Sequence, residues 1–304
     1  DLASHFLGNE QYSPADFYIA KPDGKSMLNL KELNRQIMMK AGILPTHIEC
    51  TSWCTSCRND LFFSYRKDGG TTGRMASWIG LRRGESSLTL EERIREVNMR
   101  IGEACLRSGR SREDVNVIAV TKYVSTSMTE RVLDSGLTHI GENRWQNAEE
   151  KWNALGSRGT WHFIGHLQTN KVKDVAGKFE YIHSLDRLSL AKELEKVASA
   201  RNLEIKTFVQ VNISGEDTKY GLEPEQAVPF LKELHQFPHI KVAGLMTMAP
   251  FEGEAEDTRP VFRGLRELRD DINRQAITRE PLIDLSMGMS NDFEIAVEEG
   301  ATMV

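Results

Sequence analysis

Short apolar segments alternate with segments of helical periodicity from about residue 89 to the end of the 304-residue chain. This alternation, with short connections, predicts a parallel sheet whose strands are joined by helices packed outside it. The pattern gives seven strands and the start of an eighth, and eight such units are typical of a closed (β/α)8 TIM barrel. The expected strands are residues 117–122, 138–141, 161–164, 181–185, 207–213, 242–248 and 283–286, with 303–304 beginning the last one.

An open, doubly wound sheet is the alternative architecture for this α/β alternation. It would usually bring a glycine-rich turn directly after the first strand, but VIAVTKYVST at 117–126 holds no glycine. The helix that leads into the first strand is marked by Thr89 and Glu92, which have capping-box spacing, and by Gly109 at its end. We therefore expect two domains, residues 1–84 and residues 85–304, the second truncated within its last strand.

Composition limits the classes of function that the chain can have. Its charges are mixed and the net charge of -5 is small, so no general nucleic-acid surface is expected. No apolar run approaches the length that spans a bilayer, and the N-terminal sequence lacks the features of a secretory signal. Three of the four cysteines cluster at 50–57, which is not a disulfide framework and favours a cytoplasmic protein.

Residues 1–84 differ in character from the rest of the chain. They predict strands at 16–20, 48–51 and 61–65 and a helix at 29–41, which together indicate a small α+β fragment. Cys50, Cys54 and Cys57 have a spacing that can hold an iron–sulfur cluster, but their place after a helix favours ordinary cysteines. His5 and His47 are not at metal-ligand spacing, so no metal site is predicted.

This first segment resembles the C-terminal end of the laccase-domain family, whose members are described as polyphenol oxidases or purine nucleoside phosphorylases. The resemblance rests on Cys50 and Thr51, on Phe62–Arg66 and on Thr72–Arg74. It implies a metal centre whose ligands would precede Asp1, so the segment should be inactive alone. A fusion with a genuine laccase-domain activity is the alternative hypothesis.

Polar side chains follow several expected strands of the second domain. Lys122, Asn143 and Asn212 lie at or just after the carboxyl ends of expected strands, as do the pairs His162 with His166 and Ser286 with Ser290. Barrel active sites lie at the carboxyl ends of the strands, so folding should bring these residues to one mouth. A partly desolvated lysine becomes a nucleophile toward aldehydes, and the small residues of MGMSND (287–292) can cradle a phosphate. This combination predicts a site for pyridoxal 5'-phosphate.

Residues from about 88 to 304 resemble the pyridoxal phosphate homeostasis protein family, single-domain barrels akin to the N-terminal domain of alanine racemase. The stretches that carry the resemblance are VIAVTK, HIGENRWQNAEEK, WHFIGHLQTNK, IHSLD, VQVNISGEDTKYG, GLMTM and LSMGMSNDFEIAVEEGATMV. The resemblance implies that Lys122 holds pyridoxal 5'-phosphate as a Schiff base, that Asn143 lies near the ring and that Ser290 helps to hold the phosphate. We expect the cofactor-binding residues to be Lys122, Asn143, His162, Met246, Ser286, Gly288 and Ser290.

The family continues beyond its final valine with an arginine that faces the ring nitrogen and a glycine–threonine turn. This sequence has neither after Val304, so we expect a weakened cofactor site. His162 has an alternative interpretation as a core histidine, and Met246 as a filler of gaps around the mouth.

Two hypotheses for the barrel follow. One is a monomeric carrier of pyridoxal phosphate that serves apo-enzymes and has no strong turnover. The other is a racemase-like enzyme, which would need a second base on the opposite face of the ring. Tyr123 and Tyr220 are the nearby candidates for that base. The sequence around neither tyrosine indicates a catalytic base, so we favour the carrier.

Overall fold

The chain divides into two compact units, Asp1–Arg83 and Gly84–Val304. The computed structural model describes residues 18–20, 26–28, 32, 35, 39, 88–216, 219–250 and 254–304. In the first unit, β1 (Tyr18–Ala20) and β2 (Ser26–Leu28) form an antiparallel pair, and Glu32, Arg35 and Met39 are helical. The other elements expected there, the three clustered cysteines and the residues that resemble the laccase-domain family lie outside the described residues.

Helix α4 (Leu90–Ser108) leads into the second unit and has the ends that its sequence predicts. The Thr89 hydroxyl accepts a hydrogen bond from the Glu92 backbone at 3.2 Å, and the Glu92 carboxylate accepts one from the Thr89 backbone at 2.7 Å. Gly109 ends the helix with φ of 68°, a left-handed conformation that glycine adopts readily. These caps satisfy backbone groups that a helix leaves without partners at its ends, so the boundaries could be predicted.

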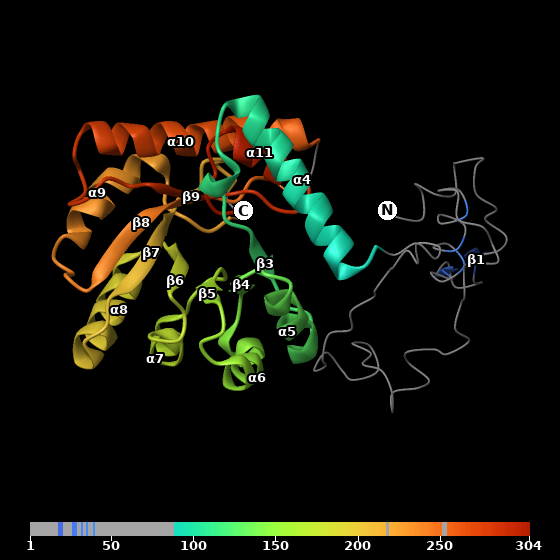
Figure 1. Cartoon of the computed structure of the whole chain (residues 1–304), viewed down its shortest axis with the longest axis horizontal. Coiled ribbons are helices and arrows are strands. Elements are labelled where there is room, and N and C mark those ends of the chain that lie inside the picture. The colour runs from blue at the N-terminus through green and yellow to red at the C-terminus, as the bar shows by residue number, and fades with distance from the viewer. Residues whose placement is uncertain are drawn as a thin grey trace. The chain divides into compact units, whose positions relative to one another are not determined.

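Seven parallel strands, paired in the order of the chain, make a curled sheet (Figure 1). Each of the seven strands expected between residues 117 and 286 is present, with bounds shifted by a few residues. The strands are β3 (Ile118–Val120), β4 (His139–Glu142), β5 (Thr160–Phe163), β6 (Tyr181–Leu185), β7 (Ile205–Gln210), β8 (Ile240–Met246) and β9 (Asp284–Ser286). Sequential pairing of parallel strands requires crossover connections, which the helices supply.

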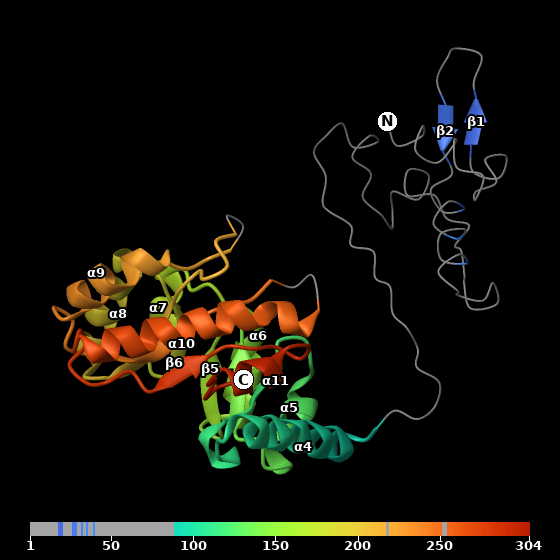
Figure 2. The ribbon, with the colours of Figure 1, turned by 90° about the horizontal axis from the view of Figure 1, so that it is seen from above.

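Helices lie outside the curled sheet and cover it (Figures 1 and 2). They are α5 (Thr126–Asp134), α6 (Trp145–Leu155), α7 (Val172–Val175), α8 (Leu188–Arg201), α9 (Pro224–Leu234), α10 (Arg259–Arg274) and α11 (Phe293–Glu298), with short 3-10 turns η2 (Arg112–Asp114), η3 (Thr169–Lys171) and η4 (Ala255–Thr258). In α8, for example, Leu190, Ala191, Leu194 and Ala198 are fully buried, and these positions follow the helical period. Among the residues that the structure describes, no helix has the length and apolarity to cross a membrane.

Residues 302–304 join the last strand to the first and so complete the ring. Met303 forms parallel bridges both with Ser286, at the end of β9, and with Asn116, just before β3. The backbone N–H of Ile118 donates to the Val304 carbonyl at 2.8 Å, and that of Met303 donates to the Leu285 carbonyl at 3.1 Å. The fold is therefore a (β/α) barrel in which 302–304 take the place of the eighth strand, as the sequence predicts.

The interior of the barrel holds its own cluster of side chains, separate from the layer between sheet and helices. Phe208, Met246 and Met303 form its centre, and Ile118 and Tyr181 pack against it. Because side chains alternate across a strand, the residues two positions along from these also face the interior.

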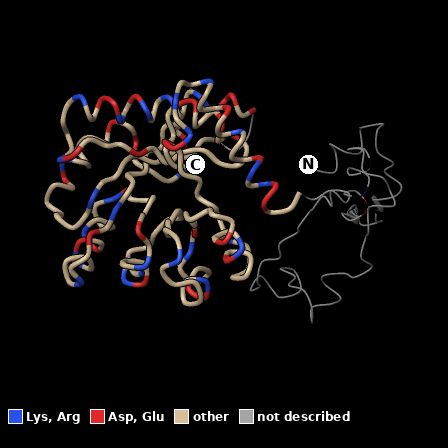
Figure 3. Tube along the Cα trace, viewed as in Figure 1, with Lys and Arg blue, Asp and Glu red and all other residues tan. Residues whose placement is uncertain are grey.

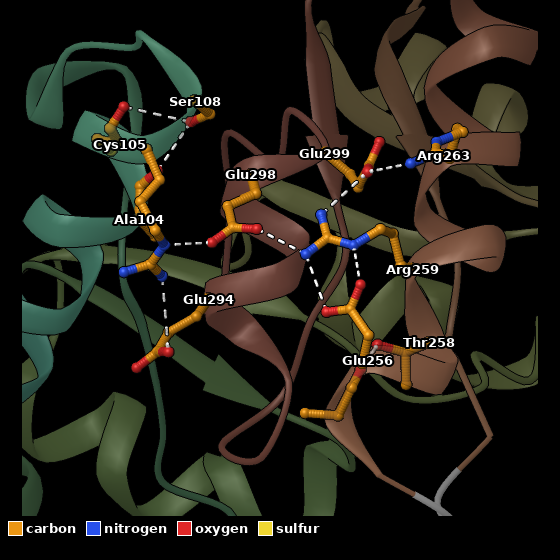
Figure 4. Close-up of polar contacts among 12 residues, drawn as sticks. Ala104, Cys105, Ser108, Glu256, Thr258, Arg259, Arg263, Glu294, Glu298 and Glu299 are labelled. Atoms are coloured by element: carbon orange, nitrogen blue, oxygen red, sulfur yellow. Dashed lines mark hydrogen bonds and ion pairs between the residues drawn. The ribbon is translucent and has the colours of Figure 1, made fainter.

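Ion pairs connect the helices on the outside of the junction between 302–304 and β3 (Figure 4). Arg107 of α4 pairs with Glu298 of α11 at 2.6 Å, and Arg259 of α10 reaches the same carboxylate at 2.7 Å. Glu299, which is buried, pairs with Arg259, Arg263 and Arg266. We call these residues, with Arg100, Glu256 and Glu294, the arginine–glutamate network. Elsewhere, acidic and basic residues are interspersed along the outer helices (Figure 3).

Candidate functional site

Lys122 lies in the turn directly after β3, at the carboxyl ends of the barrel strands, which we call the mouth. Ile118 packs in the interior cluster, so alternation along the strand places Val120 and then Lys122 on the same inward side. Val120 is 50% exposed, which means that solvent reaches the interior side of β3 next to Lys122. Lys122 is half-buried, and its Nζ lies 5.3 Å from the centre of the Tyr123 ring. The mouth therefore has an accessible amine beside the Tyr123 ring.

Asn143 follows β4, the neighbour of β3, and is also half-buried. Its side-chain oxygen Oδ1 is buried and accepts no hydrogen bond from any group in the described part of the chain. A buried acceptor without a partner is unfavourable, so this atom is available for a donor that the chain does not supply. Gly165 passes so close to this position that a Cβ there would lie 2.2 Å from the Asn143 carbonyl oxygen.

A buried ion pair stands directly behind Lys122. Lys151 of α6 donates to the Glu142 carboxylate at 2.7 Å and to the Thr121 carbonyl at 2.5 Å. The Thr121 hydroxyl donates to the same Glu142 oxygen at 2.7 Å, and Glu142 has no exposed surface. These bonds fix the backbone at Thr121 and thereby the direction in which Lys122 leaves the strand.

The loop after β9 brings several predicted residues to the mouth. Ser286 ends the strand, Gly288 has φ of 97°, and Ser290 is exposed. The Met289 backbone N–H donates to the Asp292 carboxylate at 2.5 Å, and burial raises the pKa of that carboxyl above its usual range. Within the described residues, the backbone N–H groups of Gly288, Ser290 and Asn291 donate to no other group, so they can still serve an anion.

His162 lies deeper, in a row of hydrogen-bonded side chains that crosses the interior. Its Nε2 is 2.8 Å from His139 Nδ1, and its Nδ1 is 2.9 Å from His183 Nε2. His183 Nδ1 in turn lies 2.8 Å from the Ser286 hydroxyl. Burial lowers the pKa of His162 to about 2, with smaller contributions from the two neighbouring histidines, and burial lowers the pKa of His183 to about 3. Both imidazoles are therefore neutral near pH 7.

Met246, the other predicted residue, is buried in the interior cluster at the end of β8. His166 stacks on Tyr220 with 4.4 Å between ring centres, and Asn212 uses its side chain within its own loop. The structure thus places Lys122, Asn143 and the Ser286–Ser290 loop at the mouth. His162 lies beneath the mouth, and Met246 lies in the interior cluster at the level of Ser286.

Sequence reasoning missed four residues that support the mouth: Glu142, Lys151, His139 and His183. A signal existed for the histidines, because an expected strand that carries a polar residue among apolar ones places it on one face. Lys151 gave no signal, because a lysine on an amphipathic helix is ordinarily exposed.

Two family models match the chain. That of the alanine racemase N-terminal domain matches residues 106–304, and that of the multi-copper polyphenol oxidoreductase laccase matches residues 1–82. The fold and the match together define the second unit as an alanine-racemase-type barrel. The pyridoxal phosphate homeostasis protein of Aquifex aeolicus is 45% identical to the chain, and the match covers 70% of this chain and 93% of that protein. The protein of the same name from Pseudomonas aeruginosa is 36% identical, and the match covers 71% of this chain and 92% of that protein. The chain belongs to the pyridoxal phosphate homeostasis protein family.

A solved structure supports the same assignment. The structure of PipY from Synechococcus elongatus was determined with pyridoxal 5'-phosphate (PLP) bound. PipY is 32% identical to the chain and superimposes on it with a TM-score of 0.59. The superposition covers 68% of this chain and 95% of PipY. The match with the laccase model agrees with the resemblance expected for the first segment.

Proposed function

We propose that the barrel binds pyridoxal 5'-phosphate through Lys122 and serves in pyridoxal phosphate homeostasis as a carrier. The observation that carries the proposal is the half-buried Lys122 at a solvent-accessible mouth, next to the buried and unpartnered Oδ1 of Asn143. Membership of the family and the PLP-bound PipY structure support it.

The residues at the mouth fit the chemical groups of this cofactor. When bound, pyridoxal phosphate supplies an aldehyde that condenses with a primary amine, and a phosphate that needs hydrogen-bond donors. Lys122 would provide the amine, and the free backbone N–H groups of Gly288 and Ser290 would provide donors. Asn143 Oδ1 would accept a hydrogen from a donor on the ligand, and Met246 would pack beneath it.

A carrier fits the surroundings of Lys122 better than a racemase does. Racemisation needs a second base held at the opposite face of the ring. Tyr123 is 81% exposed and Tyr220 is 63% exposed, so neither is held in a water-excluded position in the described part of the chain. We infer a cytoplasmic, monomeric protein that passes its cofactor to apo-enzymes, in line with the mixed surface charge and the cysteine usage.

Absorbance spectroscopy tests the covalent attachment. Full-length protein mixed with pyridoxal phosphate should gain a band near the visible edge, and borohydride should fix the cofactor to the peptide that holds Lys122. Lys122→Ala should lose both signals, whereas Lys173→Ala, which removes an exposed lysine of α7, should keep them. A band of equal strength in Lys122→Ala would reject the assignment.

An assay of L-alanine racemisation separates the carrier from the enzyme. The carrier hypothesis expects no turnover above that of free pyridoxal phosphate. Turnover at ordinary enzyme rates, about 1 per second or more, would overturn it.

A further inference from the structure

Three histidines and a serine form one continuous hydrogen-bonded row through the barrel. His139, His162, His183 and Ser286 come from β4, β5, β6 and β9, and each is bonded to the next at 2.8–2.9 Å. We call these four side chains the histidine relay. One end, His139, is half-buried at the start of β4, and the other end is the Ser286 hydroxyl at the end of β9, beside the mouth.

Aromatic stacking holds the two central rings in place. The His162 ring stacks on Tyr181 with 4.8 Å between centres and an angle of 3° between planes. The His183 ring stacks on Phe208 with 4.4 Å between centres and an angle of 24°. Because both histidines are buried, neither ring can turn away to find water as an alternative partner.

Counting hydrogens restricts the relay to two states. A neutral imidazole has one N–H, and each of the three contacts needs one hydrogen. In the first state every imidazole carries hydrogen on Nδ1, so His183 donates to Ser286 and leaves the serine hydrogen free. In the second state every imidazole carries it on Nε2, and the Ser286 hydroxyl donates to His183 instead. A mixed arrangement would place two hydrogens, or none, in one contact and lose a buried hydrogen bond, at a cost of about 1–3 kcal/mol.

We propose that the histidine relay switches between these two states as a unit, and that a phosphate oxygen at Ser286 selects the state with all hydrogens on Nδ1. On passing to that state, the hydrogen of each contact moves one step toward His139. The Ser286 oxygen takes a replacement proton from water at the mouth, and the half-buried His139 releases its Nε2 proton to solvent. A phosphate oxygen only accepts hydrogen bonds, so it needs the Ser286 hydrogen to point at it. That hydrogen is free only when His183 donates to the serine. His183 is thus a positioning residue for Ser286. Binding at the mouth changes which ring nitrogen of His139, on the opposite side of the interior, carries the hydrogen. The selection by phosphate rests on the proposed function, whereas the two-state behaviour does not.

Nitrogen-15 NMR of the full-length protein measures the tautomers directly, because protonated and bare imidazole nitrogens have well-separated chemical shifts. Signals are assigned with His139→Gln, His162→Gln and His183→Gln in turn. Spectra are recorded for the protein alone, with inorganic phosphate, with pyridoxal phosphate, and with pyridoxal, which has no phosphate. Absorbance of the same samples reports whether cofactor is bound.

Without ligand, the three imidazoles should share one tautomer or exchange between the two together. Different tautomers at His162 and His183 would overturn the relay, whether or not any cofactor binds. With pyridoxal phosphate, all three should show hydrogen on Nδ1, and pyridoxal should leave them unchanged. If inorganic phosphate alone has the same effect, the anion is the selecting group.

Ser286→Ala separates the relay from cofactor binding, with Ser286→Thr as the variant that retains the hydroxyl. In Ser286→Ala the tautomers should no longer respond to pyridoxal phosphate, and Ser286→Thr should restore the response. Hydrogen on Nε2 of these imidazoles in the unsubstituted protein, while absorbance shows bound cofactor, would overturn the selection and leave the proposed function intact. No absorbance band at any concentration would instead reject the proposed function, and the ligand-free spectrum would still decide the two-state behaviour.

Discussion

Acidification from about pH 7.5 to about pH 5 should destabilise the barrel by about 4 kcal/mol through His162 and His183. Burial lowers their pKa values from 6.5 to about 2 and about 3. The folded protein therefore keeps both imidazoles neutral at pH 5, whereas the unfolded chain takes up a proton on each below pH 6.5. The unfolded state then binds more protons, so stability falls as the pH falls.

The magnitude follows from the width of this pH interval. Each pH unit below 6.5 costs about 1.36 kcal/mol per histidine, so an interval of about 1.5 units gives about 2 kcal/mol for each. Burial raises the pKa values of Asp284 and Asp292, and these two groups oppose the effect because the folded state protonates them first. The contribution of one histidine is therefore best measured as a difference between variants.

Urea unfolding at the two pH values, followed by the fluorescence of the buried Trp145 and Trp161, gives the free energies of unfolding. His183→Gln should reduce the loss of stability on acidification by about 2 kcal/mol, whatever its effect at pH 7.5. His235→Gln, which changes an exposed histidine, should leave the loss unaltered. If His183→Gln loses as much stability as the unsubstituted protein, the buried histidine is not the cause.

Three further predictions concern the buried ion pair behind Lys122, the arginine–glutamate network and the close approach of Gly165 to Asn143. Lys151→Met leaves the buried Glu142 carboxylate without its cation and should cost about 3–5 kcal/mol in urea unfolding, and Glu142→Gln in the same chain should recover part of it. Burial alone would raise the pKa of Glu299, yet hydrogen bonds from arginines hold this pKa below its usual range. The ionised Glu299 therefore stabilises the folded state above about pH 4.5, and this contribution to the free energy of unfolding should be lost as the pH falls further. Glu299→Gln should flatten that part of the stability curve, and an unchanged curve would contradict the assignment. Gly165→Ala should displace Asn143 and weaken cofactor binding in an absorbance titration at least about tenfold, equivalent to about 1.4 kcal/mol, and unaltered affinity would count against a role for this residue.

The order of the elements could be predicted because each carries a local signal. The capping box of Thr89 and Glu92 determines where α4 begins, and the apolar run at Ile118–Val120 determines β3. Lys122 and Asn143 could be placed together because parallel neighbouring strands end at the same edge of the sheet.

The histidine relay could not be predicted, because it depends on register. The pairing of β6 with β7 shifts between Ile182 and Leu185, and such an irregularity changes which side chains face inward. The sequence also extends β7 to residue 213, whereas the ladder ends at Gln210 and Asn212 serves its loop. An apolar run shows where burial begins and ends, but hydrogen bonding between strands determines where a strand ends.

The closure of the ring by 302–304 has a consequence for how the barrel forms and opens. Bridges between Asn116 and Met303 connect segments that are far apart along the chain, so they gain nothing until the intervening units are ordered. This joint should therefore form late and exchange its amide hydrogens early. The arginine–glutamate network spans the same joint from outside, and partly exposed charges are screened by salt. Ionic strength should thus control how often water enters the barrel at the point where its first and last segments meet.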